Sequence, residues 1–364
     1  MITILLIVAT IAYVLLMLYV QEGLRRANIP ERVIGYEPCV SIIVAARNEE
    51  EYLAQCIESL LQIQYPREKL EIIIVNDNST DRTPEIIEQY YKTQPIIIIN
   101  AIQGKGNLLG KTNAITQGIE ASTGEILMFT DADCVVSPYW VNETVQFFDK
   151  NVGIVGGYTL LKASRIFEGM QTLDWLYLFS IASAAAGWKT PLTVIGNNFS
   201  VRRSAYDATG GYRGIPFSVT EDHALVQAIS AKSAFKIRFP MNARTVVESH
   251  ACQSWSQLFR QKQRWGVGGL DMVPLGILNA LIIWIFRFFV LAGLVWANPL
   301  NVMLSVLGLF VVDGIFIGRP LHKFNAMKHF KYFIAFEIYC TLYGLIVPFI
   351  ALASRKIVWK ERTL

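Results

Sequence analysis

Residues 128–134, Met128-Phe129-Thr130-Asp131-Ala132-Asp133-Cys134, are the stretch that decides the fold of this chain. The apolar run that leads into them, Ile126 to Phe129, predicts a buried strand. Asp131 and Asp133 follow this strand, at the end where α/β sheets bind their ligands. Carboxylate oxygens bind hard divalent cations such as Mg²⁺, which in turn hold phosphates. An Asp-x-Asp triplet also occurs in solvated turns and at helix N-caps, so its meaning depends on the rest of the chain.

The composition indicates a soluble middle part between two apolar ends. Of the 364 residues, 53% are hydrophobic and 17% are charged, an unusual balance for a soluble protein. The net charge of +4 is modest and gives no sign of a nucleic-acid partner. The five cysteines are scattered without a Cys-x-x-Cys pair, which argues against a zinc site or a disulfide framework and fits a reducing compartment.

The first apolar segment, Ile2 to Val20, carries no charge and is long enough to cross a bilayer. A cleaved signal peptide is the alternative, but neither a basic start nor a small-residue cleavage site is obvious. Arg25, Arg26 and Arg32 follow, so the positive-inside rule places the next part of the chain in the cytoplasm. We predict a transmembrane helix over residues 1–22 and a multi-pass protein of the cell (inner or plasma) membrane.

Residues 36–268 are predicted to form one α/β domain. The expected strands are Val40–Ala45, Leu70–Val75, Pro95–Asn100, Ile126–Phe129 and Val152–Leu160. The expected helices open at Asn48, near Pro84, at Lys111 and at Thr220. This alternation predicts a largely parallel sheet with ligands at the strand ends. The apolar stretch Trp175 to Trp188 is too short to span a bilayer and fits an interfacial helix or a core helix equally well.

Residues 272–354 are expected to form a second membrane region. Met272 to Val312 contains one charge, Arg287, and is too long for a single span, so Asn298-Pro299 near its middle predicts a helical hairpin. Tyr332 to Ser354 is a further candidate span. A full span there would place the basic tail outside, against the positive-inside rule, so we expect a re-entrant or interfacial segment.

Three charged residues lie inside these apolar segments: Arg287, Asp313 and Glu337. A buried charge in such a segment is costly and is usually paired. We expect the three residues to pair with one another, and a lining of a lipid headgroup path is the alternative.

Six short stretches resemble, in the same order, motifs of the family 2 glycosyltransferases. They are Ala45-Ala46-Arg47-Asn48-Glu49-Glu50, Asn76-Asp77-Asn78-Ser79-Thr80-Asp81-Arg82-Thr83, Gly110-Lys111-Thr112-Asn113-Ala114, Thr130-Asp131-Ala132-Asp133, Thr220-Glu221-Asp222 and Gln261-Lys262-Gln263-Arg264-Trp265. The resemblance covers roughly Val40 to Gly268, and the flanking apolar segments are similar to those of membrane-bound members. It implies a GT-A fold, a Rossmann-like mixed sheet for nucleotide-diphospho-sugars, here flanked by transmembrane helices.

The resemblance implies a donor site at the strand ends. A carboxylate can accept the imide N–H of a uracil ring, and this is the role implied for Asp77, with Ala45, Arg47 and Glu49 also at the nucleotide sugar. Lys111 offers a positive charge for the diphosphate. The structural alternatives are a turn residue for Asp77 and a solvated helix lysine for Lys111.

The same resemblance implies a divalent cation, Mg²⁺ or Mn²⁺. Asp133 would be its direct ligand, and Asp131 would lie near the ribose and the metal. Such a cation offsets the negative charge of the departing diphosphate.

Glu221 and Asp222 form the second carboxylate site. Direct displacement at a sugar's anomeric carbon needs a base that takes the proton of the acceptor hydroxyl. Asp222 matches the family position of that base, and Glu221 is given a supporting role. An acidic pair at a helix N-terminus is the structural alternative. The four histidines form no spaced metal motif. His223 is next to Asp222 and could tune the site, but we expect it to be an ordinary surface histidine.

Residues 255–265 predict an amphipathic, basic helix on the membrane surface. Gln261, Arg264 and Trp265 are spaced i, i+3 and i+4, so one helix presents them together. Arg264 can bind the diphosphate through its fork of donors, and Trp265 can pack on the sugar or shape the acceptor site. Lys262 lies at a position that varies within the family and decides nothing.

The sequence therefore predicts an inverting, metal-dependent hexosyltransferase of the membrane. It would move a hexose from a nucleotide sugar, expected to be a UDP-sugar, to a lipid-like acceptor at the cytoplasmic face. A processive polysaccharide synthase is one alternative, although such synthases usually have more spans than the three or four counted here. A dolichyl- or polyprenyl-phosphate sugar transferase is another, and a non-catalytic scaffold is disfavoured because all the expected acids are present.

Overall fold

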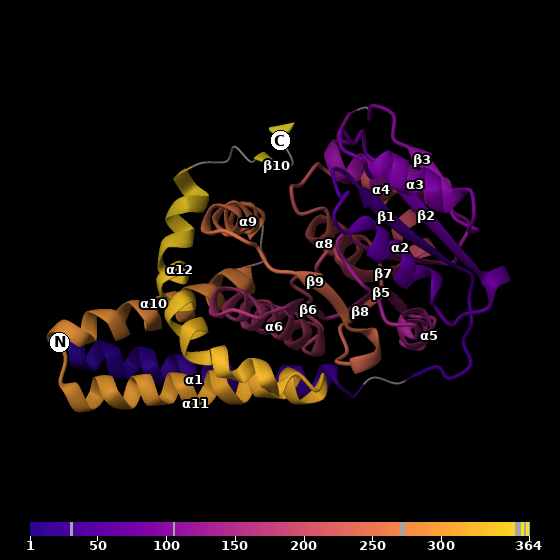
Figure 1. Ribbon diagram of the computed structural model, residues 1–364. Coiled ribbons are helices and arrows are strands. Elements are labelled where there is room, and N and C mark those ends of the chain that lie inside the picture. The colour runs from indigo at the N-terminus through magenta and orange to yellow at the C-terminus, as the bar shows by residue number, and fades with distance from the viewer. Residues whose placement is uncertain (30–31, 105, 270–273, 354–357, 360–361, 364) are drawn as a thin grey trace.

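The computed structural model describes residues 1–29, 32–104, 106–269, 274–353, 358–359 and 362–363. Its soluble part is built on a seven-stranded sheet with the strand order β3-β2-β1-β4-β7-β5-β8 (Figure 1). The strands are β1 Val40–Ala46, β2 Leu70–Asn76, β3 Ile97–Asn100, β4 Ile126–Thr130, β5 Val152–Gly156, β6 Thr159–Lys162, β7 Asn198–Arg202, β8 Lys236–Arg238, β9 Val247–His250, β10 Val358–Trp359 and β11 Arg362–Thr363. Within this sheet only β7 runs antiparallel to its neighbours, which confirms the expected mixed, largely parallel sheet.

Helices cover both faces of this sheet. The α-helices are α1 Ile2–Ala27, α2 Leu53–Leu61, α3 Thr83–Tyr91, α4 Gly110–Glu120, α5 Trp140–Val145, α6 Ile166–Gly187, α7 Arg203–Asp207, α8 Glu221–Lys232, α9 Trp255–Gly268, α10 Pro274–Trp296, α11 Pro299–Lys323 and α12 Phe333–Ala353. Alternate residues of β1, which is apolar except for Ser41, pack in two different cores. Ile42 packs in the core that contains α2 and α3, and Ile43 packs in the core that contains α4. A strand buried on both faces needs apolar residues at successive positions.

Two expectations for the soluble part are wrong in detail. The helix expected from Asn48 begins only at Leu53, because Asn48 has a positive φ of 51° and belongs to a loop. The strand expected over Val152–Leu160 is two strands, β5 in the large sheet and β6 beside β9 in a separate parallel pair. Gly157 lies at the break, where a Cβ atom would come within 2.5 Å of the Asn198 side chain.

The stretch 175–188 was expected to be either an interfacial helix or a core helix, and nearly all of it lies in α6. This helix is longer than expected, and fifteen of its 22 residues are buried. It packs against α1, α11 and α12 on one side and against β6 on the other. Helix α6 is therefore a core helix between the sheet domain and the apolar helices.

Among the residues that the structure describes, four helices are long and apolar enough to cross a membrane: Ile2–Ala27, Pro274–Trp296, Pro299–Lys323 and Met327–Ile350. At Asn298-Pro299, where the hairpin was expected, α10 ends at Trp296 and α11 begins at Pro299, and the side chain of Asn298 accepts from the Leu300 N–H. The expected limits of this region, residues 272 and 354, lie outside the described residues.

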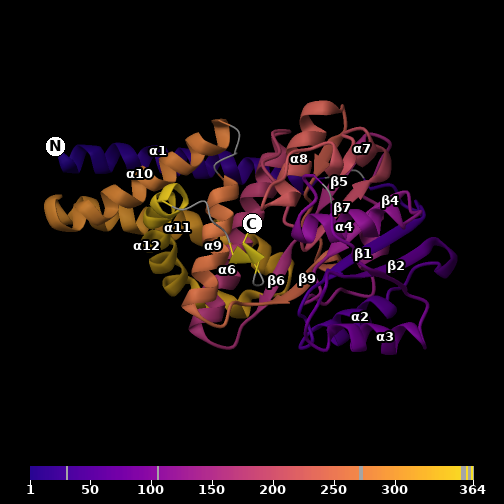
Figure 2. The same ribbon diagram turned by 90° about the horizontal axis from the view of Figure 1, so that it is seen from above.

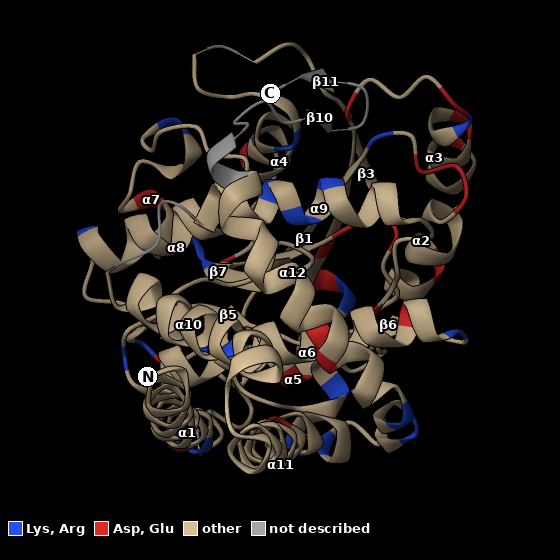
Figure 3. Cartoon of the chain, turned by 90° about the vertical axis from the view of Figure 1, so that its left-hand side faces the viewer, with Lys and Arg blue, Asp and Glu red and all other residues tan. Residues whose placement is uncertain are grey.

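Figures 1 and 2 show α1, α10 and α11 side by side, with α12 running across them. In Figure 3 the turns of α1 and α11 nearest the viewer carry neither basic nor acidic residues. The axes of these three helices are roughly aligned, so the helices form one apolar bundle. Helix α12 has a different direction from that bundle.

The three charged residues of the apolar segments pair with one another, as expected. The Arg287 guanidinium lies 3.3 Å from the Asp313 carboxylate and 3.4 Å from the Glu337 carboxylate. The Tyr13 hydroxyl also donates to Asp313, so the cluster joins α1, α10, α11 and α12. All of these side chains are buried, which supports a structural pairing rather than the lining of a lipid path.

Candidate active site

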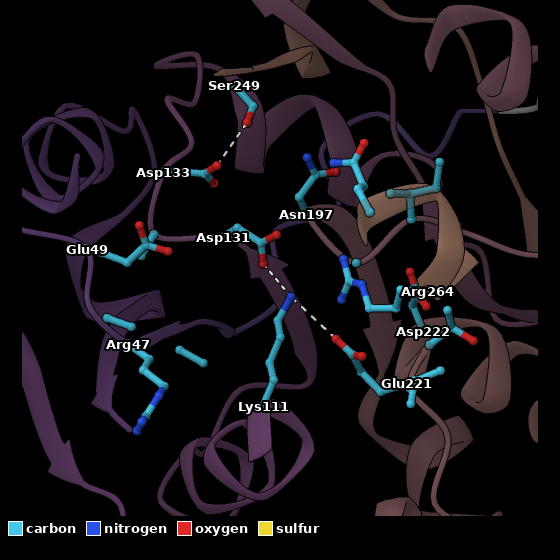
Figure 4. Close-up of a pocket in the computed structure, with 18 of the residues that line it drawn as sticks. Arg47, Glu49, Lys111, Asp131, Asp133, Asn197, Glu221, Asp222, Ser249 and Arg264 are labelled. Carbon is cyan, nitrogen blue, oxygen red and sulfur yellow. Dashed lines mark hydrogen bonds and ion pairs between the residues drawn. The ribbon is translucent and has the colours of Figure 1, made fainter. Parts of the chain in front are cut away.

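One cavity of about 210 Å³ lies where β1, β2 and β4 end and where α8 begins. Its lining contains every residue to which the sequence assigned a role at the site. These residues are Ala45, Arg47, Glu49, Asp77, Lys111, Asp131, Asp133, Glu221, Asp222, Gln261, Arg264 and Trp265. They come from six stretches of the chain, which the fold brings to one place (Figure 4).

Asp77 lies directly after β2 and lines the cavity. Its backbone N–H donates to the carbonyl of Ala46 at 2.8 Å, and its side chain is only 2% exposed. The Arg47 guanidinium donates to the carbonyls of Asp77 and Asn78 at 2.8 and 3.0 Å. Arg47 thus ties together the loops that follow β1 and β2 and fixes the position of Asp77.

Lys111 lies between the two acidic sites. Its ammonium is 2.5 Å from Asp131 and 3.4 Å from Glu221 (Figure 4). Burial disfavours the charge of this ammonium, but Asp131 and Glu221 outweigh burial and raise the pKa of Lys111 above its usual value. Lys111 is therefore a charged lysine held inside the site, and not the solvated helix lysine of the alternative.

The second aspartate of the triplet faces strand β9. Asp133 accepts a hydrogen bond from the Ser249 hydroxyl at 3.3 Å. The next residue, His250, also lines the cavity, and its ring stacks on Tyr52 with 4.3 Å between the ring centroids. The Nε2 atom of His250 is buried and has no hydrogen-bond partner in the part of the chain that the structure describes.

The acidic side of the cavity fits a divalent cation that also contacts a diphosphate. Within the described ranges, no three His, Cys, Asp or Glu side chains are grouped so as to hold a metal ion by themselves. Mg²⁺ is commonly held by one or two carboxylates together with phosphate oxygens and water, so a complete protein cage is not needed. Asp131 and Asp133 offer such a partial set of ligands.

Asp222 has the electrostatic properties of a base that works near neutral pH. Burial, followed by the charge of Glu221, raises the pKa of Asp222 to about 7. The N–H of His223 donates to one of its oxygens at 2.8 Å. A carboxyl with a pKa near the working pH is well suited to accept a proton.

Gly196 leaves the space in front of these carboxylates open. A Cβ atom at this position would lie 3.3 Å from Asp222, 3.5 Å from Glu221 and 3.6 Å from the Lys111 ammonium. A larger side chain here would therefore occupy the centre of the cavity.

The expectation for His223 is wrong. Its side chain is buried at 8% exposure, and it does not line the cavity. Its Nε2 atom lacks a hydrogen-bond partner among the described residues. The sequence could not show this, because the position of His223 in the first turn of α8 depends on the elements packed around that helix.

Helix α9 presents Gln261, Arg264 and Trp265 to the cavity, as their spacing predicted. Lys262, which seemed uninformative, is buried on the same helix and forms an ion pair with Asp174 of α6. Its ammonium also lies 4.3 Å from the centre of the Trp265 ring. One signal for this pair was available, since Asp174 is the only charged residue between 169 and 187.

Comparison with known proteins agrees with these motifs. Residues 41–222 match the family model described as glycosyl transferase family 2. The chain belongs to this family. It is therefore a glycosyltransferase, and the resemblance seen in the six stretches is confirmed.

Two curated relatives illustrate the range of the family. The chain is 29% identical over 252 residues to a beta-monoglucosyldiacylglycerol synthase of Nostoc sp., covering 67% of this chain and 52% of that protein. It is 23% identical over 294 residues to a poly-beta-1,6-N-acetyl-D-glucosamine synthase of Staphylococcus epidermidis, covering 79% of this chain and 68% of that protein. The chain spans about half the length of the first relatives that it matches.

The fold is shared with a solved structure. The mannosyltransferase PcManGT from Pyrobaculum calidifontis, in complex with GDP-Man and Mn²⁺, aligns over 93% of this chain and 98% of its own with a TM-score of 0.63. At 18% identity this similarity concerns the fold alone. It confirms a GT-A fold for the glycosyltransferase, here flanked by apolar helices.

Proposed function

We propose that this glycosyltransferase transfers a hexose from a UDP-sugar to a lipid-like acceptor at the cytoplasmic membrane face, with inversion at the anomeric carbon. The observation that carries the proposal is Asp222, a carboxyl with a pKa of about 7 in the same cavity as Asp131, Asp133 and Arg264. The lipid acceptor is supported by the diacylglycerol-glycosylating relative and by the four long apolar helices.

In this proposal the donor lies along the strand ends. The Asp77 carboxylate, beside Ala45, Arg47 and Glu49, accepts a hydrogen bond from the uracil ring. Because Asp77 is buried, this hydrogen bond is strong. Lys111 and Arg264 hold the diphosphate, with Gln261 and Trp265 beside the sugar. Mg²⁺ or Mn²⁺, held by Asp133 with Asp131 and His250 nearby, would supply positive charge to the leaving diphosphate.

The acceptor hydroxyl then donates a hydrogen bond to the carboxylate of Asp222. This carboxylate takes the hydroxyl proton as the oxygen attacks the anomeric carbon, and the bond from that carbon to the diphosphate breaks. Glu221, at 3.4 Å from Lys111, raises the pKa of Asp222 and so supports its basicity. Attack from the side opposite to the leaving group inverts the anomeric configuration.

The membrane placement rests on the direction of the apolar helices. The bundle of α1, α10 and α11 crosses the bilayer, and the crosswise helix α12 lies in it as a re-entrant or interfacial segment. With three crossings the basic residues after α1 and after α11 both face the cytoplasm, as the positive-inside rule requires. The cavity then opens on the side where nucleotide sugars are made.

The test is a donor screen with purified protein in lipid, followed by mass spectrometry of the lipids that gain a hexose. Release of UDP together with one hexose per lipid, lost in an Asp222→Asn variant, is the expected result. A product with retained anomeric configuration, or transfer that is unchanged in Asp222→Asn, would contradict the proposed mechanism.

A processive polysaccharide synthase is the second candidate. It is favoured by the poly-N-acetylglucosamine synthase relative and by the Gln261-x-x-Arg264-Trp265 motif, which resembles that of processive synthases. Product length separates the two, because a synthase gives a polymer ladder and the proposed enzyme gives a single addition. Transfer to a polyprenyl phosphate, the third possibility from the sequence, would appear as a glycosylated lipid phosphate in the same experiment.

A further inference from the structure

A second cavity, of about 420 Å³, lies where the apolar bundle meets the sheet domain. It is lined by Asn28, Met241, Ile315, Gly318, Arg319, His322 and Lys323. Asn28 directly follows α1, Met241 belongs to the segment after β8, and the other five residues lie in the last turns of α11. None of them lines the candidate active site, so this cavity needs an explanation of its own.

The mouth of this cavity is basic and has no acidic partner. Arg319, His322 and Lys323 are exposed, and none of them forms an ion pair with a described acidic residue. Arg319 donates only to the backbone carbonyl of Gln21, at 3.3 Å. Glu22, the next residue along α1, is already engaged by Arg25 and Arg26 at 2.7 and 2.9 Å.

An apolar stripe leads along α11 to this basic mouth. Leu304, Leu307, Val311 and Ile315 are each 50–56% exposed and lie three or four residues apart, so they share one face of the helix. Arg319 and Lys323 continue the same spacing by one turn each. Gly318 leaves the wall of the cavity open, because a Cβ atom there would meet no atom within 4 Å.

We propose that this cavity binds the phosphate headgroup of an anionic phospholipid of the surrounding bilayer. Arg319 and Lys323 pair with the phosphate, His322 donates a hydrogen bond, and the acyl chains follow the apolar stripe of α11. A free phosphate would use only the basic mouth, whereas a lipid uses both the mouth and the stripe. The Asn28 side chain also accepts from the Met241 N–H at 2.6 Å, so the bound lipid lies against the junction between bundle and catalytic domain.

The experiment measures lipid binding to the full chain in nanodiscs of phosphatidylcholine with increasing phosphatidylglycerol, using native mass spectrometry. The double variant Arg319→Gln, Lys323→Gln is expected to bind phosphatidylglycerol at least about tenfold more weakly than the parent. The matched control is Lys328→Gln, Lys331→Gln, which removes the same charge from two exposed lysines outside the cavity and is expected to change binding less than about twofold. Equal losses in both variants would mean general surface attraction and would overturn the proposal.

A charge-neutral variant tests the cavity itself. Gly318→Leu fills the space beside Arg319 without changing charge, and it is expected to weaken phosphatidylglycerol binding while nucleotide binding is unchanged. Unchanged lipid binding in this variant would overturn the assigned position. Inorganic phosphate at millimolar concentration is expected not to displace the lipid, and displacement would assign the cavity to free phosphate instead. All arms report lipid occupancy, so they do not depend on the proposed transfer reaction.

Discussion

The buried pair between Lys262 and Asp174 gives the sharpest test of how α9 is positioned. Both side chains are 3% exposed, and the Lys262 ammonium lies 4.3 Å from the Trp265 ring and 5.1 Å from the Tyr343 ring. Removing one partner of such a buried pair leaves an uncompensated charge, which costs about 3–5 kcal/mol. Lys262→Met should therefore destabilise the protein by about this amount and release α9 from α6.

The double variant Lys262→Met, Asp174→Leu is the matched control. Replacing a buried ion pair with apolar side chains of similar size is often neutral or stabilising, so stability should return to near the parental value. Because α9 also carries Gln261, Arg264 and Trp265, the single variant should bind the nucleotide donor more weakly, and the double variant should regain much of that affinity.

The assay combines unfolding of the purified protein in detergent with titration of the donor nucleotide. A single variant with parental stability would show that the pair makes no net contribution. A double variant as unstable as the single variant would show that Lys262 acts through something other than its partner Asp174. Either result would refute the reasoning.

Four further predictions concern the proposed reaction and its location. Asp222→Asn should lower kcat by roughly 10²–10⁴-fold with little change in donor affinity, whereas Glu221→Gln should lower kcat less. If Glu221→Gln were inactive and Asp222→Asn active, the two assignments would be reversed. Because the pKa of Asp222 is raised to about 7 and the base must be unprotonated, kcat/KM should rise with pH up to about 7 and level off above it, a dependence that a pH profile of Asp222→Asn should lack. Asp133→Ala should abolish turnover and weaken donor binding, and near-normal activity of this variant in chelator would argue against metal dependence. Topology reporters fused after Arg32 or within residues 85–94 should indicate a cytoplasmic location of these positions. An extracellular location of both fusion sites would overturn the proposed sidedness.

Local patterns in the sequence were sufficient for most of the fold. The apolar runs of β1, β2 and β4 needed no tertiary information, because strands covered by helices on both faces are apolar at most positions. The residues that line the cavity were identified by the resemblance of their motifs to those of family 2 glycosyltransferases. The motifs after β1, β2 and β4 meet because the carboxyl ends of parallel strands lie at one edge of the sheet.

The features that the sequence did not reveal depend on contacts between distant segments. The lone charge of Asp174 in an apolar stretch indicates that it needs a partner, but only the fold shows that this partner is Lys262, 88 positions away. Ser249 and His250 join the cavity because β9 pairs with β6, a pairing that was hidden while β5 and β6 were expected to be one strand. His223 is buried by neighbours that its own sequence context does not indicate.

The charged cluster of the apolar helices has a consequence for how the protein is assembled during synthesis. Arg287 leaves the ribosome 26 residues before Asp313 and 50 residues before Glu337. In the proposed membrane arrangement, a lone arginine near the middle of α10 makes insertion less favourable by about 2.5–3.5 kcal/mol, so α10 by itself inserts less readily than its apolar residues alone would allow. We therefore expect α10 to remain beside the translocon until α11 supplies Asp313, and the two helices to enter the lipid as one unit, against an α1 that already offers the hydroxyl of Tyr13.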